Sequence, residues 1–254
     1  MFDTNSSLGL LLDLNSQAGP ANHGAMSENL EVRQAVADDL PVILRLIDEA
    51  ARWLHAKGTD QWREPWPSKE ARDNRVLRGL QSGSTWLVTS GDTAVATITY
   101  RQHARQEQDV NQPQDGDREL WTEAEQSEPA VYVSRLVVRR EYSGLDIGGA
   151  LTDWAGLRGA RGWSAQWIRI DVWTTNEALH NYYAKRGFEF CRICPFDQET
   201  YPSAALFQKP TSNADVVAAA RFAEVPSTSP ALTGGPAVQS LPATAAPARL
   251  AAAV

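Results

Sequence analysis

Cysteine is scarce in this chain, and its scarcity excludes several kinds of chemistry. Only two cysteines occur among 254 residues, Cys191 and Cys194, in a CxxC spacing. A tetrahedral zinc site would need two more ligands, and the four histidines are scattered along the sequence. A thioredoxin-type pair would open a helix, whereas Pro195 favours a strand that runs into a loop. The sequence therefore predicts no metal site and no redox-active cysteine pair.

Long hydrophobic runs and an excess of basic residues are also missing. No stretch approaches the roughly 20 apolar residues of a membrane-spanning helix. The N-terminal segment lacks the basic start of a signal peptide, so we expect a cytoplasmic protein that engages no membrane. The net charge of -7 argues against non-specific nucleic-acid binding, which needs clustered cations. This acidity is compatible with a cationic partner such as an amine, and it also suits solubility alone.

What is present is the composition of a soluble domain with low-complexity ends. The chain is 43% hydrophobic and 22% charged, and its 9 tryptophans suit a substantial core or an aromatic pocket. Residues 1–28, rich in Ser, Asn, Gly and Ala, predict a flexible leader. Residues 211–254, rich in Ala, Pro, Ser and Thr, predict a disordered tail, in which 215–224 suit a transient helix. The folded part is then one domain over residues 29–210.

Within this domain, apolar residues recur at helical spacing in some stretches and form short β-rich runs in others. The strongest helical pattern runs from Leu40 to Leu54, and Gly58 ends it. Gly91-Asp92 between two β-rich runs marks a hairpin turn. The predicted elements are strands at 30–33, 85–90, 93–101, 130–138, 167–173, 188–193 and 204–208, and helices at 40–57, 68–81, 147–160 and 176–186.

Residues 102–129 form the longest internal stretch without a periodic pattern. The stretch is acidic and polar, and its only bulky apolar residues are Val110, Leu120 and Trp121. Loops of this length inside a compact domain are usually functional lids or disordered. We therefore predict a long loop between neighbouring strands.

A glycine-rich turn joins the strand at 130–138 to the helix at 147–160, and it contains Gly144, Gly148 and Gly149. A helix N-terminus exposes unbonded amide N–H groups and a partial positive charge, and glycines let an anion approach them closely. Taken alone, the turn suits a tight strand-to-helix connection equally well. Neither GxxxxGK[ST] nor GxGxxG is present, which disfavours a P-loop and a dinucleotide fold.

The order of elements and two spaced motifs resemble the GCN5-related N-acetyltransferase (GNAT) superfamily, and the resemblance covers most of residues 29–210. In that family a strand ending in L-x-V precedes a turn of the form Q/R-x-x-G-x-G/A. Residues 136–138 and 143–148 stand in these places here. The family's later segment, N-x-x-A-x-x-x-Y-x-x-x-G-F, is matched by Asn176, Tyr183, Gly187 and Phe188, with Leu179 in place of the small residue.

Two positions of the turn depart from the family pattern. Ser143 replaces the Arg or Gln, and Asp146 replaces the first motif glycine. Aspartate tolerates unusual backbone angles better than most residues, but its carboxylate would repel a pyrophosphate unless it points outward. Arg139 or Arg140 is the candidate to compensate, although both also suit a solvated surface.

The resemblance implies an α/β fold of the α+β kind: a mixed, mostly antiparallel sheet with a central splayed parallel strand pair and helices on both faces. It implies acetyl-CoA as the cosubstrate, bound where the two parallel strands part, and no metal. An amine then attacks the acetyl group directly in a ternary complex. The residues implied for the cofactor are Leu136, Val137, Val138, Ser143, Gly144, Leu145, Asp146, Ile147, Gly148, Gly149 and Asn176.

Tyr183 is implied as the general acid that protonates the departing thiolate, and it also suits a plain core position. Many relatives place a glutamate in the strand before the turn, but Ser134 stands there, so this base is missing. A water chain is one substitute. The other candidates for the base are Asp60, His55, Glu119 and Asp171, each of which also suits a structural or solvated role.

The acceptor pocket is expected around the loop that follows the first helix. Asp60 lies there, flanked by Trp62 and Trp66, and Trp121 of the acidic loop is expected to close over the same pocket. The implied acceptor is a primary amine of a small molecule, or a peptide N-terminus or lysine, and a homodimer is compatible with the sequence. Two other functions stay open: a degenerate acyl-CoA-binding module without catalysis, and a protein-interaction domain whose turn is purely structural.

Overall fold

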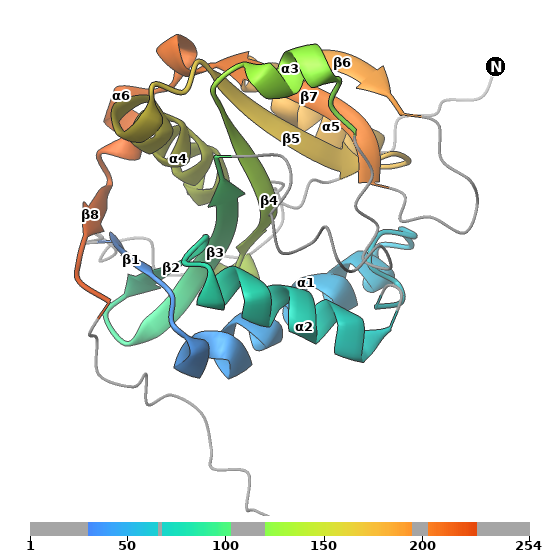
Figure 1. The fold of residues 1–254 in the computed structure, drawn as a ribbon. Helices are drawn as coiled ribbons and strands as arrows, with labels where there is room; N and C mark the ends of the chain where they lie inside the picture. Colours follow the sequence, from blue (N-terminus) through green and yellow to red (C-terminus); the bar gives the residue numbers. More distant parts are fainter. Residues whose placement is uncertain (1–29, 66–67, 103–119, 195–202, 228–254) are drawn as a thin grey trace, which may run out of the picture.

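Residues 30–65, 68–102, 120–194 and 203–227 are described by the structure, a computed structural model, and they form a single mixed sheet with helices on both faces (Figure 1). The order of the 8 strands is β6-β7-β5-β4-β3-β2-β1-β8. Neighbouring strands are antiparallel except for the pairs β4–β5 and β1–β8. The predicted fold class, with its central parallel pair, is confirmed.

The predicted helices and strands are all present, with ends that differ by a few residues at most. The strands are β1 (Leu30–Gln34), β2 (Thr85–Ser90), β3 (Thr93–Arg101), β4 (Ala130–Val138), β5 (Trp167–Trp173), β6 (Glu189–Ile193), β7 (Ser203–Pro210) and β8 (Phe222–Glu224). The α-helices are α1 (Leu40–Ala56), α2 (Lys69–Gln81), α3 (Glu123–Ser127), α4 (Ile147–Trp163), α5 (Glu177–Lys185) and α6 (Val216–Ala219).

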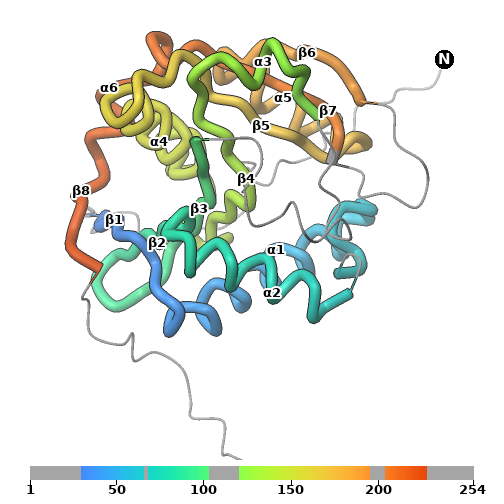
Figure 2. The backbone as a smooth tube through the Cα atoms, in the orientation of Figure 1, coloured from blue at the N-terminus to red at the C-terminus, as the bar shows by residue number. Residues whose placement is uncertain are grey.

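The helices cover the two faces of the sheet in separate groups (Figure 2). On one face, α1 and α2 pack their apolar stripes against β2, β3 and the end of β4. On the other, α4 and α5 cover β4, β5 and β7. Helix α4 can lie close to the sheet because Gly156 and Gly159 have no side chains. A Cβ atom at Gly156 would overlap Ile168, and one at Gly159 would overlap Val131. The second half of α4 is thereby packed against β5 and the beginning of β4.

The acidic stretch 102–129 holds more structure than the predicted loop. Residues 103–119 lie outside the described residues, but α3 forms within the remainder. Thr122 caps this helix by accepting from the backbone N–H of Glu125, and the Glu125 carboxylate bonds back to the backbone N–H of Thr122. Such a capping box stabilises a helix too short to show an apolar period.

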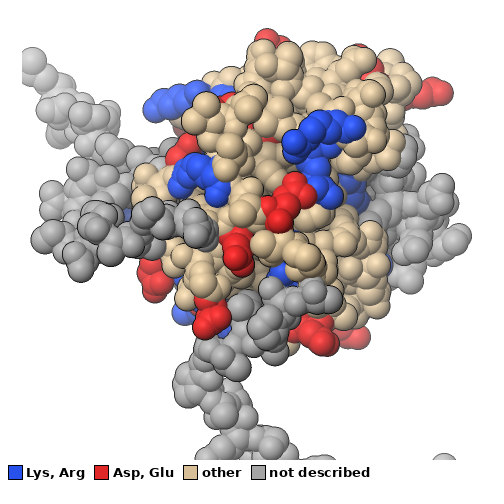
Figure 3. All heavy atoms as spheres, turned by 90° about the vertical axis from the view of Figure 1, so that its left-hand side faces the viewer, with Lys and Arg blue, Asp and Glu red and all other residues tan. Residues whose placement is uncertain are grey.

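The C-terminal segment corrects the predicted boundary at residue 210. Residues 211–224 were assigned to a disordered tail, yet they form α6 and β8, and β8 pairs in parallel with β1. Phe222 is buried in the main core, and Asp215 caps α6. Lysine, arginine and acidic side chains are interspersed on this side of the molecule (Figure 3). The predicted leader 1–28 and residues 228–254 lie outside the described residues.

Among the described residues, no helix is long and apolar enough to cross a lipid bilayer. Within the same ranges, no group of three or more His, Cys, Asp or Glu side chains is placed to hold a metal ion. Cys191 and Cys194 are both free and partly buried.

Candidate active site

The parallel strands β4 and β5 are paired at one end and diverge at the other. Their pairing runs from Ala130 opposite Trp167 to Val133 opposite Ile170. Beyond this point the described part of β4 pairs with β3, and that of β5 pairs with β7. Residues 137 and 138 therefore keep their ladder to β3, and residues 136–138 have no ladder to β5.

A β-bulge in β4 begins this divergence. Thr99 and Thr97 of β3 lie opposite Ser134 and Val137 of β4, so one residue of β3 faces two of β4. Arg135 at this point has a φ of 46°, in the left-handed region. An extra residue bends its strand and increases the local twist, which turns the end of β4 away from β5.

The glycine-rich turn lies at the end of β4, and α4 begins directly after it. Gly144 has a φ of 87° and Asp146 a φ of 54°, both left-handed. Asp146 therefore adopts the conformation for which the family uses glycine, at a smaller steric cost than most side chains would bring. Gly148 and Gly149 are buried in the first turn of α4.

The charges around this turn differ from the predicted arrangement. The carboxylate of Asp146 forms an ion pair with Arg186, which follows α5. Arg139 instead lies 3.6 Å from the Glu49 carboxylate, and the Arg140 guanidinium lies 4.1 Å from the centre of the Trp53 ring. Arg139 and Arg140, the arginines expected to compensate for Asp146, thus both contact α1.

The loop after α1 is tied to the diverging end of β5. Asp60 accepts hydrogen bonds from Trp173 Nε1 at 3.2 Å and Thr175 Oγ1 at 2.8 Å. Asn176 caps α5 by accepting from the backbone N–H of Leu179, and its Nδ2 donates to Gln61 Oε1 at 2.6 Å. The structure thus brings Asp60 and Asn176, far apart in sequence, to the same end of the strand pair.

Tyr183 lies on α5, which packs against β5, with 7% of its surface exposed. Its ring makes edge contacts with Tyr182 and Phe188, each at 5.3 Å between centroids. Burial raises the pKa of Tyr183, and the charge of Asp171 adds to the rise. Among the described residues no hydrogen-bond partner of its hydroxyl is found. The hydroxyl therefore keeps its proton at neutral pH.

Comparison with known proteins agrees with this geometry. The model of the acetyltransferase (GNAT) family matches residues 47–188, more than half of the chain. The chain belongs to the GNAT acetyltransferase family. An uncharacterized N-acetyltransferase of Bacillus subtilis (strain 168), YesJ, is 26% identical over 156 residues, which make up 61% of this chain and 79% of the relative.

A solved structure shows the GNAT fold independently. The GNAT acetyltransferase of Listeria monocytogenes 4b F2365 superposes with a TM-score of 0.51 and 21% sequence identity. The match covers 71% of this chain and 94% of that one. This likeness shows that the strands and helices around the diverging β4–β5 pair belong to the GNAT fold.

Two tryptophans predicted for the acceptor pocket of this GNAT domain lie in different places. Trp62 has a φ of 56° and packs against the cluster beneath α1 and α2. Trp121 is only 4% exposed and packs edge-on against Tyr132. The Arg169 guanidinium also lies over the Trp121 ring. Arg169 is four residues before Trp173, the partner of Asp60, along β5, a distance on the order of 13 Å. The structure therefore does not bring Trp121 to Asp60.

The remaining candidates for the base and the pocket also lie in different parts of the molecule. His55 is exposed on the last turn of α1, and Asp171 lies on β5 near Tyr183. Ser134 directly follows Val133, the last residue of β4 that pairs with β5. Its Oγ is buried without a hydrogen-bond partner among the described residues. Glu119 and Trp66 lie outside the described residues.

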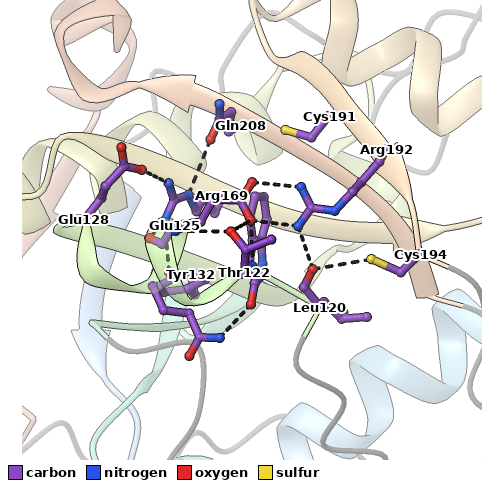
Figure 4. A network of polar contacts seen from close by, with 12 residues as sticks. Leu120, Thr122, Glu125, Glu128, Tyr132, Arg169, Cys191, Arg192, Cys194 and Gln208 are labelled. Atoms are coloured by element: carbon purple, nitrogen blue, oxygen red, sulfur yellow. Dashed lines mark hydrogen bonds and ion pairs between the residues drawn. The ribbon is translucent and has the colours of Figure 1, made fainter.

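A polar network around Arg169 and Arg192 (Figure 4) was not predicted from the sequence. The fully buried guanidinium of Arg169 donates to the backbone carbonyl of Glu125, to the Glu128 carboxylate and to the Tyr132 hydroxyl. Arg192 donates to both carboxylate oxygens of Glu125, at 2.8 and 2.7 Å. The network fastens α3 to the paired end of β4 and β5. A charged residue inside the apolar run 167–173 was the available signal.

Proposed function

We propose that this GNAT acetyltransferase transfers the acetyl group of acetyl-CoA to a primary amine of a small molecule or peptide, by direct attack in a ternary complex. The observation that carries the proposal is the divergence of β4 and β5 directly before the N-terminus of α4. This arrangement offers a free strand edge to an amide-bearing arm and a helix N-terminus to a phosphate group.

The cofactor residues follow from that arrangement. The backbone of Leu136, Val137 and Val138 has no ladder to β5 and is assigned to the pantetheine arm and the acetyl carbonyl. The turn from Ser143 to Gly149 is assigned to the pyrophosphate. Asn176 is assigned a positioning role, because its side chain caps α5 and binds Gln61.

Tyr183 is the proposed general acid. The amine nitrogen attacks the acetyl carbonyl carbon, the carbon–sulfur bond breaks, and the Tyr183 hydroxyl gives its proton to the departing thiolate. Its raised pKa keeps the hydroxyl protonated before the reaction, and a positioned O–H makes the thiolate a better leaving group. The proton lost by the amine restores the hydroxyl through solvent, which balances the reaction.

The amine loses its proton to water in this proposal, with Ser134 as part of the relay. The buried Oγ of Ser134 has no partner among the described residues and lies where β4 leaves β5. Asp60 is a weaker candidate for the base, because its carboxylate already accepts hydrogen bonds from Trp173 and Thr175. We assign Asp60 to holding the acceptor loop.

The test is a screen of amines with acetyl-CoA. Release of free CoA thiol and the mass of the acetylated amine are measured together, and a reaction without amine corrects for hydrolysis. We expect thiol and acetylated amine in equal amounts for at least one amine. Raised melting temperature with CoA but no thiol release for any amine would instead favour the degenerate binding module. A folded protein that binds neither CoA nor acetyl-CoA would favour the interaction domain.

A further inference from the structure

Asp146 keeps the backbone conformation of the glycine that it replaces, but it brings a carboxylate to the start of α4. Its φ is 54°, and its side chain makes no capping hydrogen bond to the helix. The carboxylate forms an ion pair with Arg186 instead. The negative charge is thus turned to the end of α5, and the free N–H groups of α4 stay open to another acceptor.

The Arg186 side chain is held at this place by contacts with two elements. Its guanidinium lies 5.7 Å from the centre of the Tyr182 ring, and Nε lies 3.4 Å from the Tyr182 hydroxyl oxygen. The guanidinium also lies over Gly149, where a Cβ atom would overlap it. The Arg186 side chain is 23% exposed, so part of it is open to solvent, although the Nη2 atom that pairs with Asp146 is buried.

A pyrophosphate bound at the turn beside Asp146 would need a cationic side chain to balance the negative charges. A pyrophosphate carries about two negative charges, and Asp146 alone would add a third that repels them. Ser143 supplies no positive charge, and Arg139 and Arg140 contact α1. Arg221 lies at the turn as well, but its guanidinium donates to the backbone carbonyl of Leu145 at 2.7 Å. The planar fork of an arginine has five N–H donors, so it can bind a carboxylate and a phosphate oxygen together.

We infer that Arg186 is the cationic side chain of the cofactor's pyrophosphate site, and that Asp146 holds it in position when the site is empty. The inference rests on the proposed function, since it takes CoA as the ligand. It explains why an acidic residue is tolerated at the turn: Asp146 and Arg186 enter the site as a neutral pair.

The test compares two ligands that share one arm. Binding of CoA and of pantetheine, which lacks every phosphate, is measured by isothermal titration calorimetry for wild type and Arg186→Gln. Arg161→Gln is the matched control, because Arg161 is an exposed arginine on the last turn of α4, on the order of 20 Å from Ile147. Circular dichroism melting confirms that each variant is folded.

We expect Arg186→Gln to weaken CoA about tenfold, the usual worth of a charged hydrogen bond, and to leave pantetheine unchanged. Arg161→Gln should change neither by more than about twofold. Adding Asp146→Gly to Arg186→Gln should recover only part of the lost affinity, because the repelling carboxylate is gone but the cationic donor to the phosphate is still missing. Unchanged CoA affinity in Arg186→Gln, or an equal loss for both ligands, would overturn the assignment. A wild-type protein that binds no CoA would overturn the proposed function and the inference with it.

Discussion

An arginine bound to a carboxylate lies near each end of the β4–β5 pair, and the two arginines differ in exposure. At the paired end, the side chain of Arg169 is 0% exposed and its donors bind a carbonyl, a carboxylate and a hydroxyl of the protein. At the diverging end, the Arg186 side chain is 23% exposed and lies over the first turn of α4. An arginine–carboxylate pair stabilises the fold at the paired end. At the diverging end, in our proposal, such a pair binds the cofactor.

This difference separates the expected effects of mutation. A buried arginine that satisfies several acceptors leaves a cavity and unpaired groups when it is removed. An ion pair that is partly open to solvent contributes about 0–1 kcal/mol to stability. Changes at the paired end should therefore alter stability and leave chemistry intact, whereas changes at the diverging end should do the reverse.

The largest effect is expected for Arg169→Ala. The substitution leaves a cavity beside Trp121 and removes the donors to the Glu125 carbonyl and the Tyr132 hydroxyl. We expect the free energy of unfolding to fall by about 3–4 kcal/mol, measured by urea denaturation, with CoA affinity of the folded protein unchanged. The exposed Arg161→Ala should change it by no more than about 0.5 kcal/mol. A loss below about 1 kcal/mol for Arg169→Ala would remove the contrast between the two ends.

Tyr183→Phe tests the diverging end of the strand pair. We expect kcat to fall about 100-fold, equivalent to about 2.7 kcal/mol, because the departing thiolate loses its proton donor. The melting temperature and the Kd for acetyl-CoA should stay near their wild-type values, since no hydrogen bond of the hydroxyl to the described residues is lost. Tyr100→Phe, a buried tyrosine stacked on Trp86, is the control and should keep its kcat. Equal kcat in wild type and Tyr183→Phe would contradict the assignment of the acid.

The elements of this fold could be predicted because their signals are local. The β-rich runs, the helical spacing between Leu40 and Leu54 and the glycines of the turn each act within a few residues. The conformation of Asp146 was also within reach, because aspartate is among the few residues that accept a left-handed backbone. The match to the GNAT pattern then fixed how these elements assemble.

The partners of the site residues could not be predicted in the same way. Arg186 meets Asp146 from a different element, and Asp60 meets Trp173 across more than 100 residues of sequence. The strand β8 has three residues in an Ala-rich segment, so its pairing with β1 leaves no periodic signal. The short helix α3 after Trp121 is stabilised by its capping box and has no apolar stripe. Its residues therefore show no helical period, and a loop was predicted around Trp121.

The smallest effect is expected from pH at the paired end, and it shows how far the Arg192–Glu125 pair supports α3. Hydrogen bonds from Arg192, together with those from Thr122, lower the pKa of Glu125 from 4.5 to about 2. Because the folded state prefers the charged carboxylate, the stabilisation is fully present above about pH 4.5 and is lost as the pH falls toward about 2. Both side chains are partly exposed, so the contribution is about 1 kcal/mol.

Urea denaturation of wild type and Glu125→Gln at about pH 7 and about pH 2.5 measures this contribution. We expect the difference in unfolding free energy to be about 1 kcal/mol at the higher pH and to shrink toward zero at the lower one. Glu123→Gln, an exposed position on the same helix, should differ from wild type by no more than about 0.5 kcal/mol at either pH. A difference for Glu125→Gln that is the same at both pH values would mean that packing of α3, rather than the charge of Glu125, holds this end of the strand pair together.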